Sequence, residues 1–571
     1  MTRCYSPVAA VVCGHLAYCC PAYGQVPPDG GAVLKELQRT EPVAKPPAPT
    51  PELRLPEEKP APPLDPAAAK VLVRDFRITG ASLISADELR QEIAPYIGTE
   101  QSVADLRKIA LRLSDVYRRK GYFARALLPQ QRVREGVVEI AIIESKLSAI
   151  DVEVLPATRL SEDRARRYIT AQQAAGVPLS PEATQKAMRN LNDLPGVEAT
   201  GVLQPGDAQG DVKLAVRVES PPLFTASAYV DNFGLKATGQ ARAIGLGQLN
   251  SPLGLGDQLT LLGVATERSD YERIGYTIPV GYNGLRAGVS AARLGYRLNG
   301  LFSGFSGTAA IYGASLAQPL RRTSTSNLYG SVLIEHKRFV NDGVGGANLS
   351  DKNLKTATLD MRGDFTDGFF GGARNVYSLG LVAGQLDLGR NAASLTADQV
   401  GPRTQGGFIK LPWTFQRVQR LATGWDFSAN FSGQFANRNL DGYEKFSIGG
   451  PAGVRAYPTG EALGDEGWIA NLELRHAFSA EFQGSAFVDS GRISLLHSTF
   501  PGSNAANPAK PNSYSLHGMG LGLTYGRPAD WLIRGMVAWK LGSNPGRDAA
   551  GNDTDGGHSR ARAWIQIAKF F

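Results

Sequence analysis

Residues 221–571, more than half of the chain, carry the pattern that most restricts its fold, with large apolar side chains at every second position. In segment 274–282, one face holds Ile274, Tyr276, Ile278, Val280 and Tyr282. Segments 427–435, 468–475 and 517–525 repeat the alternation with small or polar residues between. Because side chains of a β-strand point alternately to the two faces of a sheet, the pattern predicts long strands with one apolar face.

A membrane-embedded β-barrel explains this alternation better than a soluble sandwich, because no second apolar layer is available to cover the apolar face. At roughly 20–22 residues for each strand and its turn, the region holds about 16 antiparallel strands. No stretch of about eighteen consecutive apolar residues follows the first 24 residues, so no membrane-spanning helix is predicted. The aromatic pair Phe570–Phe571 suits closure of the last strand at an aromatic girdle.

The first 24 residues have the features of a secretory signal peptide. Arg3 precedes a weakly apolar run from Val8 to Ala17, and Ala22-Tyr23-Gly24 supplies small residues for cleavage after Gly24. A lipoprotein signal at Cys19 is the weaker alternative, because the bulky Tyr18 precedes it. The chain has four cysteines, Cys4, Cys13, Cys19 and Cys20. Removal of residues 1–24 would leave none, as suits an exported chain without disulfides.

A short helix is predicted over residues 29–40, with Val33, Leu34 and Leu37 on one side. Residues 41–66 follow, and ten of these twenty-six positions are proline. Such a segment is extended and semi-rigid, with a reach of up to about 80 Å. It is therefore interpreted as a linker between the short helix and the next domain.

Two small α+β domains are predicted between the linker and the barrel, at residues 71–146 and 147–220. Both follow the order β-α-α-β-β. In the first domain, Ser102 and Asp105 form a helix start that resembles a capping box, and Gly121 is suited to end that helix. Each sheet has an edge that could accept an added strand.

Motifs of catalysis and of cofactor binding are absent from the sequence. The stretch GGPAGVRAYPTGEALGDEG (449–467) lacks Gly-Lys-Ser/Thr and precedes a strand, which excludes a phosphate-binding loop. GMGLG (518–522) lies in an alternating strand, and Asp465 and Glu466 read as solvated loop charges. The six histidines lack metal-ligand spacing, and the net charge of +8 forms no dense basic face. The sequence predicts no enzyme, cofactor, metal site or nucleic-acid partner.

Several motifs together resemble one family. They are FRITGASLI (76–84), GYFARALLPQQ (121–131) with Gly121, Tyr122, Pro129 and Gln131, LNDLPGV (191–197), YVDNFGLKATGQ (229–240), LNSPLGLGDQLTL (249–261) and AFVDSGRI (486–493) with Phe487, Asp489 and Gly491. On these motifs the chain resembles a two-partner secretion outer-membrane transporter, the TpsB family of ShlB/FhaC/HecB-like haemolysin secretion/activation proteins. The resemblance identifies the two small domains as POTRA domains (polypeptide-transport-associated) and residues 29–40 as a plug helix.

The resemblance also gives the glycine-rich stretch a place. The family's sixth extracellular loop carries a VRGY or VRGF motif and folds into the barrel. This chain has Val454, Arg455, Ala456 and Tyr457, so alanine replaces the usual glycine and restricts the backbone slightly. The family pairs the loop arginine with the strand aspartate, which here implies a pair of Arg455 and Asp489. A bidentate guanidinium suits a partly desolvated carboxylate.

The resemblance implies a function in the outer membrane of a Gram-negative bacterium. The POTRA domains would capture a secreted exoprotein of the adhesin or haemolysin type by its amino-terminal secretion domain, and the barrel would conduct it to the surface. Other expected partners are outer-membrane lipid and the barrel assembly machinery. The alternatives are a barrel-protein assembly factor, which typically has more POTRA domains and no plug, and a passive solute pore, which needs no POTRA domains.

Overall fold

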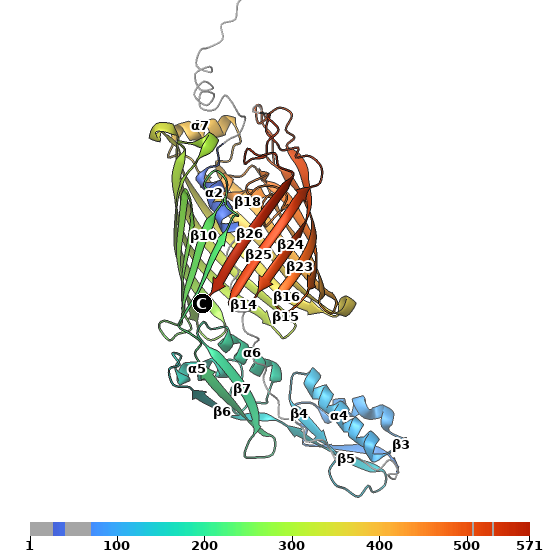
Figure 1. The fold of residues 1–571 in the computed structure, drawn as a ribbon. Coiled ribbons are helices and arrows are strands. Elements are labelled where there is room, and N and C mark those ends of the chain that lie inside the picture. The colour runs from blue at the N-terminus through green and yellow to red at the C-terminus, as the bar shows by residue number, and fades with distance from the viewer. Residues whose placement is uncertain (1–26, 40–69, 505–506, 528–529) are drawn as a thin grey trace, which may run out of the picture.

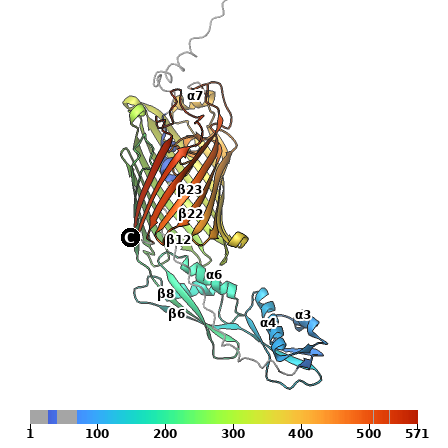
Figure 2. The ribbon, with the colours of Figure 1, turned by 45° about the vertical axis from the view of Figure 1, so that its right-hand side comes forward.

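The computed structural model describes residues 27–39, 70–504, 507–527 and 530–571. These residues form two small α+β domains and a closed β-barrel that encloses a short helix (Figure 1, Figure 2). The predicted signal peptide and proline-rich linker lie outside the described residues, as does residue 40 of the predicted plug helix. In the described part of the chain, no helix has both the length and the hydropathy needed to span a membrane.

The first domain packs two helices against one face of a three-stranded sheet with the order β2-β5-β4. Its elements are β1 (Val71–Leu72), β2 (Asp75–Thr79), α3 (Ala86–Ile93), β3 (Glu100–Gln101), α4 (Val103–Arg119), β4 (Ala124–Leu127) and β5 (Val137–Glu144). Ser102 begins α4, because its hydroxyl accepts a hydrogen bond from the Asp105 amide. Gly121 follows α4 with φ +84°, a conformation that favours glycine. The buried apolar side of α4 includes Leu113 and Tyr117.

The second domain repeats this order of elements and contacts the barrel. It comprises β6 (Lys146–Val154), α5 (Glu162–Thr170), α6 (Pro181–Asn192), β7 (Glu198–Pro205) and β8 (Asp211–Glu219), with the sheet order β6-β8-β7. Asp193 accepts a hydrogen bond of 2.6 Å from Arg322 of the barrel. The rings of Tyr168 and Tyr282 meet edge to face at 5.2 Å. These contacts join the second domain to one end of the barrel, here called the domain end, and the opposite end is the distal end.

The barrel confirms the predicted fold class, because sixteen described strands close into a ring. They are β9 (Phe224–Asp231), β10 (Arg242–Asn250), β11 (Gln258–Thr266), β12 (Ser269–Val280), β13 (Leu285–Arg297), β14 (Ser306–Arg322), β15 (Ser326–Asp342), β16 (Asn348–Asp367), β17 (Ala373–Asp387), β18 (Gly406–Ala422), β19 (Trp425–Ala436), β22 (Glu466–Ala477), β23 (Phe482–Ser494), β24 (Ser513–Gly526), β25 (Trp531–Lys540) and β26 (Ala561–Phe570). Neighbouring strands are antiparallel, and β26 pairs with β9 to close the ring.

Alternation along the strands produces an apolar outer wall. Val289, Ile334 and Leu521 are each more than half exposed on this wall. On the inner side, glycines make room for larger side chains. A Cβ atom added to Gly520 of β24 would lie 2.3 Å from the ring of Phe487, so only glycine fits beside this ring. The spaced glycines of GMGLG therefore belong to the packing of the barrel interior.

Several shorter elements complete the structure. Helix α2 (Gly30–Arg39) lies inside the barrel, and α7 (Ala392–Val400) lies at the distal end (Figure 1). Two short strands, β20 (Phe446–Ser447) and β21 (Leu463–Gly464), pair with each other between β19 and β22. The 3-10 helices are η1 (Ala94–Tyr96), η2 (Gly300–Phe302), η3 (Val344–Gly346), η4 (Phe369–Gly371) and η5 (Gly442–Glu444).

Candidate functional site

The connection between β19 and β22 folds into the barrel instead of projecting from its distal end. Strands β20 and β21 form its stem, and residues 448–462 between them are here called the lumenal loop. The Val454 amide donates to the Ile448 carbonyl at 2.7 Å, which closes a compact turn. Val454, Ala456 and Tyr457 are at most 1% exposed. The predicted loop motif is therefore packed against the inner wall.

Arg455 at the loop tip forms a bidentate ion pair with Asp489 of β23. Its Nε lies 2.9 Å from Oδ2 of Asp489, and its Nη2 lies 2.8 Å from Oδ1. The Arg455 amide also donates to Oδ2 at 3.0 Å. Asp489 is fully buried, so this carboxylate depends on such donors for its charge to be stable inside the protein. The structure thus brings together the two residues that the family resemblance pairs.

Two further groups fix the guanidinium from other sides. Its Nη1 lies 2.7 Å from Oε2 of Glu473 on β22. The Phe487 ring lies beneath it, with the guanidinium carbon 3.3 Å from the ring centroid. Asn471 supports the acceptor by donating to Oδ1 of Asp489 at 2.8 Å. The sequence analysis did not identify Glu473 and Asn471 as part of the site, although they lie two positions apart on one face of a predicted strand.

Gly491 and Ala456 allow the close approach of loop and wall. A Cβ atom on Gly491 would lie 3.2 Å from a methyl group of Val454, so glycine leaves room for the loop. Ala456 faces Gly518 of β24, where an added Cβ atom would lie only 2.7 Å from the Ala456 methyl. Ala456 is absent from the described residues with positive φ. Its backbone therefore has no need of glycine, and its methyl group fills space that Gly518 leaves open.

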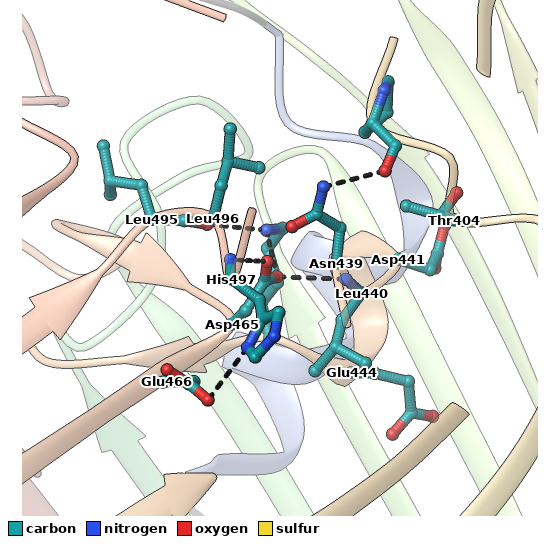
Figure 3. A network of polar contacts seen from close by, with 12 residues as sticks. Thr404, Asn439, Leu440, Asp441, Glu444, Asp465, Glu466, Leu495, Leu496 and His497 are labelled. Atoms are coloured by element: carbon teal, nitrogen blue, oxygen red, sulfur yellow. Dashed lines mark hydrogen bonds and ion pairs between the residues drawn. The ribbon is translucent and has the colours of Figure 1, made fainter. Parts of the chain in front are cut away.

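The stem of the lumenal loop is held by Asp465, which directly follows β21 and is fully buried (Figure 3). Its carboxylate accepts hydrogen bonds from the amides of Leu440 at 3.1 Å and His497 at 2.8 Å. Lys445 donates to the same carboxylate. Asp465 was interpreted from sequence as a solvated charge, and that interpretation is wrong, because three neighbouring segments converge on it.

Helix α2 occupies the lumen beside the loop (Figure 1). Val33 and Leu34 are fully buried and Leu37 is 6% exposed, within a cluster that includes Phe339 and Leu298 of the barrel. These are the three apolar residues that the sequence placed on one side of the helix. The helix therefore fills part of the barrel interior with its apolar side against the wall.

Charged contacts hold both ends of α2. At its start, Asp29 lies 2.5 Å from the Nζ of Lys352 on β16, which also contacts Asp441. At its end, Arg39 donates to the Gly449 carbonyl at 2.6 Å and to the Ser447 hydroxyl at 3.0 Å. Arg39 therefore connects the helix directly to the stem of the lumenal loop. Sequence analysis missed Lys352, although a lysine at an inward strand position was a signal that could have identified it.

The motif GYFARALLPQQ (121–131) lies in the first domain, apart from the barrel. The Gln131 side chain exchanges two hydrogen bonds with the backbone of Glu139 on β5, at 2.8 Å and 2.7 Å. Gly121 ends α4, and the Tyr122 amide donates to the Tyr117 carbonyl at 3.0 Å. Pro129 precedes Gln131 in the connection between β4 and β5. These contacts order a connection that runs beside the edge of the sheet.

Ion pairs and hydrogen bonds hold both α2 and the lumenal loop in place inside the barrel. Several of its buried charged groups form ion pairs, such as Lys410 with Glu444 at 2.7 Å. Within the described residues, no group of three or more His, Cys, Asp or Glu side chains could hold a metal ion. The site therefore consists mainly of ion pairs and hydrogen bonds around the lumenal loop and α2.

Two solved structures are similar in fold. The structure of CdiB from Escherichia coli matches with a TM-score of 0.68 at 18% identity, covering 100% of both chains. The structure of BamA from Haemophilus ducreyi lacking POTRA domains 1–3 matches with a TM-score of 0.51 at 16% identity, covering 87% of this chain and 100% of that one. At these identities the likeness concerns the fold alone.

Curated proteins are similar in sequence over most of their length. The heme/hemopexin transporter protein HuxB of Haemophilus influenzae is 27% identical over 470 residues, 81% of this chain and 82% of the relative. The outer membrane transporter CdiB of Dickeya dadantii is 22% identical over 418 residues, 70% of this chain and 72% of the relative.

Two family models match the chain. Residues 71–145 match the POTRA domain of ShlB type. Residues 209–525, more than half of the chain, match the haemolysin secretion/activation protein family ShlB/FhaC/HecB. The chain belongs to the ShlB/FhaC/HecB family of haemolysin secretion/activation proteins.

Proposed function

We propose that this protein secretes one large exoprotein, of the adhesin or haemolysin type, through its barrel by two-partner secretion. The observation that carries the proposal is a helix of only ten residues, α2, held inside a closed barrel by side-chain contacts rather than by strand pairing. A helix attached in this way can leave without dismantling the wall. Membership of a family of secretion proteins supports the same conclusion.

The domains would act on the periplasmic side, where the exoprotein arrives. Residues 71–146 and 147–220 serve as POTRA 1 and POTRA 2 in this proposal. Strand β7 lies at one edge of the sheet β6-β8-β7 and has a strand neighbour on one side only. An incoming extended segment of the exoprotein's amino-terminal secretion domain could add to such an edge through backbone hydrogen bonds.

The barrel (221–571) would be the conduit, with the distal end at the cell surface. The plug helix leaves the lumen, the proline-rich linker (41–66) gives it reach, and the exoprotein folds outside, which prevents its return. The apolar outer wall contacts outer-membrane lipid, and the barrel assembly machinery inserts the protein. We propose no enzymatic step.

The proposal is tested by comparing culture supernatants and cell-surface proteins of the native host with and without this gene. Loss of one large β-rich exoprotein, with other outer-membrane barrels intact, is the expected result. General depletion of outer-membrane barrels would instead identify an assembly factor. An unchanged secretome combined with reduced solute uptake would identify a passive pore.

Replacement of Arg455 by alanine is expected to reduce secretion at least tenfold while the barrel still inserts. Asp489 would then keep a buried charge without its bidentate partner, at a cost of about 3–5 kcal/mol. Arg455→Lys should give an intermediate loss, because an ammonium group cannot bind both carboxylate oxygens in the guanidinium geometry. Secretion is measured by quantifying the exoprotein in the medium, and insertion by heat-modifiable mobility of the barrel.

Arg475→Lys is the matched control, because Arg475 contacts Glu473 at 2.8 Å from its other side and lies outside the pair with Asp489. It should leave secretion near the wild-type level. Normal secretion by Arg455→Ala would remove the lumenal loop from the mechanism.

Replacement of Lys352 by methionine is expected to loosen the plug helix. Asp29 and Asp441 would face each other without the cation that now lies between them. Single-channel recordings in planar bilayers should show open events at least about tenfold more often than in the wild type. Lys355→Met on the same strand is the control, because Lys355 is exposed on the outer side. An equal frequency of open events in Lys352→Met and Lys355→Met would contradict the role of Lys352 as the anchor of the plug.

A further inference from the structure

The strand pair that closes the barrel is shorter than its neighbours. Strands β26 and β9 share five paired positions, from Gln566 with Asp231 to Phe570 with Ser227. Strand β9 shares eight with β10, and β26 shares nine with β25. Because β9 ends at Asp231, residues 561–565 of β26 extend toward the distal end without strand pairing on that side. Figure 1 shows β26 running diagonally across the wall, next to the first strands of the barrel.

A single side chain replaces the missing strand on this part of β26. The Nδ2 of Asn232 donates to the Ala563 carbonyl at 3.0 Å, and the Ile565 amide donates to its Oδ1 at 2.9 Å. The Asn232 amide also donates to the Ile565 carbonyl at 3.3 Å. An asparagine side chain can imitate a peptide group in this way. Strand pairing in this stretch therefore depends on one residue rather than on a ladder.

The lumenal loop contacts both sides of this short seam from inside the barrel. On the β26 side, the indole Nε1 of Trp564 donates to the Arg455 carbonyl at 2.8 Å, and Trp564 is 3% exposed. On the β9 side, the Thr459 hydroxyl donates to the Phe233 carbonyl at 2.8 Å. The Phe233 and Trp564 rings meet edge to face at 5.8 Å across the seam. Both hydrogen bonds are buried, so water cannot replace them while the loop stays in place.

We propose that the lumenal loop is an internal clasp on the barrel seam, with Trp564 and Thr459 as positioning residues. Arg455 holds the loop to β23 through its side chain and holds β26 through its carbonyl group. Withdrawal of the loop removes both bonds across the seam and leaves residues 561–565 dependent on Asn232. Conversely, an intact seam favours the docked loop by the same free energy, because coupling between two sites is reciprocal. Loop movement and loosening of the seam are one event.

The inference is tested by amide hydrogen exchange of the full-length protein in lipid nanodiscs, without any exoprotein. Trp564→Phe removes the indole donor and keeps a ring beside Phe233. Thr459→Val removes the hydroxyl and keeps the shape. Each variant should accelerate exchange of amides 565–570 about fivefold, as expected for the loss of one buried hydrogen bond, while amides in β14–β16 keep their rates.

Trp539→Phe on β25 is the matched control, because this indole lies on the outer wall and is 40% exposed. It should leave exchange in β26 unchanged. A disulfide between Val230→Cys and Ile567→Cys, which are register partners at the seam, should restore protection in the Trp564→Phe variant. All other cysteines of the sequence lie in its first twenty positions.

Unchanged exchange of amides 565–570 in both Trp564→Phe and Thr459→Val would overturn the proposal. Equal acceleration in every strand would also overturn it, because it would indicate general destabilisation of the barrel. The measurement needs no secretion, so its failure would leave the proposed transport function standing. A failure of transport would likewise leave the clasp intact.

Discussion

The ion pair between Arg455 and Asp489 is the interaction on which the arrangement of the barrel interior depends. It places the lumenal loop against β23, and the remaining contacts of the loop follow from that position. From there the lumenal loop and its stem reach Arg39 of α2, and the tip of the loop reaches Trp564 at the seam. A bidentate pair of buried charges suits this role, because its geometry is directional and because loss of one partner leaves a buried charge without compensation.

The helix and the loop that fill the barrel interior are held there by non-covalent side-chain contacts. Asp29 with Lys352, and Lys410 with Glu444, form ion pairs inside the barrel. Buried ion pairs of this kind add little net stability compared with apolar packing, but each requires one geometry. The wall itself is held by backbone ladders, which are independent of these side chains. The contacts that hold α2 and the lumenal loop are therefore separate from those that hold most of the wall.

Much of this organisation could be predicted from the sequence, because it rests on local patterns. Alternation in segments such as 274–282 specified strands with one apolar face, and the family resemblance placed Arg455 opposite Asp489. The sequence could not predict the contacts of Lys352, Arg39 and Trp564. These contacts depend on the register of strands that are far apart in the sequence and on how deeply the lumenal loop enters the barrel. The burial of Asp465 was not predicted for the same reason, since its partner Leu440 lies 25 residues earlier in the same connection and its partner His497 lies in the connection between β23 and β24.

The central claim is that the exported chain passes through the space now filled by α2. A photo-crosslinking amino acid at Phe339, buried beneath the helix, would test it during secretion of a stalled exoprotein. Ile334 on the same strand is the comparison, because it faces outward and is 59% exposed. The account predicts crosslinks to the exoprotein from position 339 and none from position 334. Secretion that proceeds with crosslinks only from position 334 would contradict it.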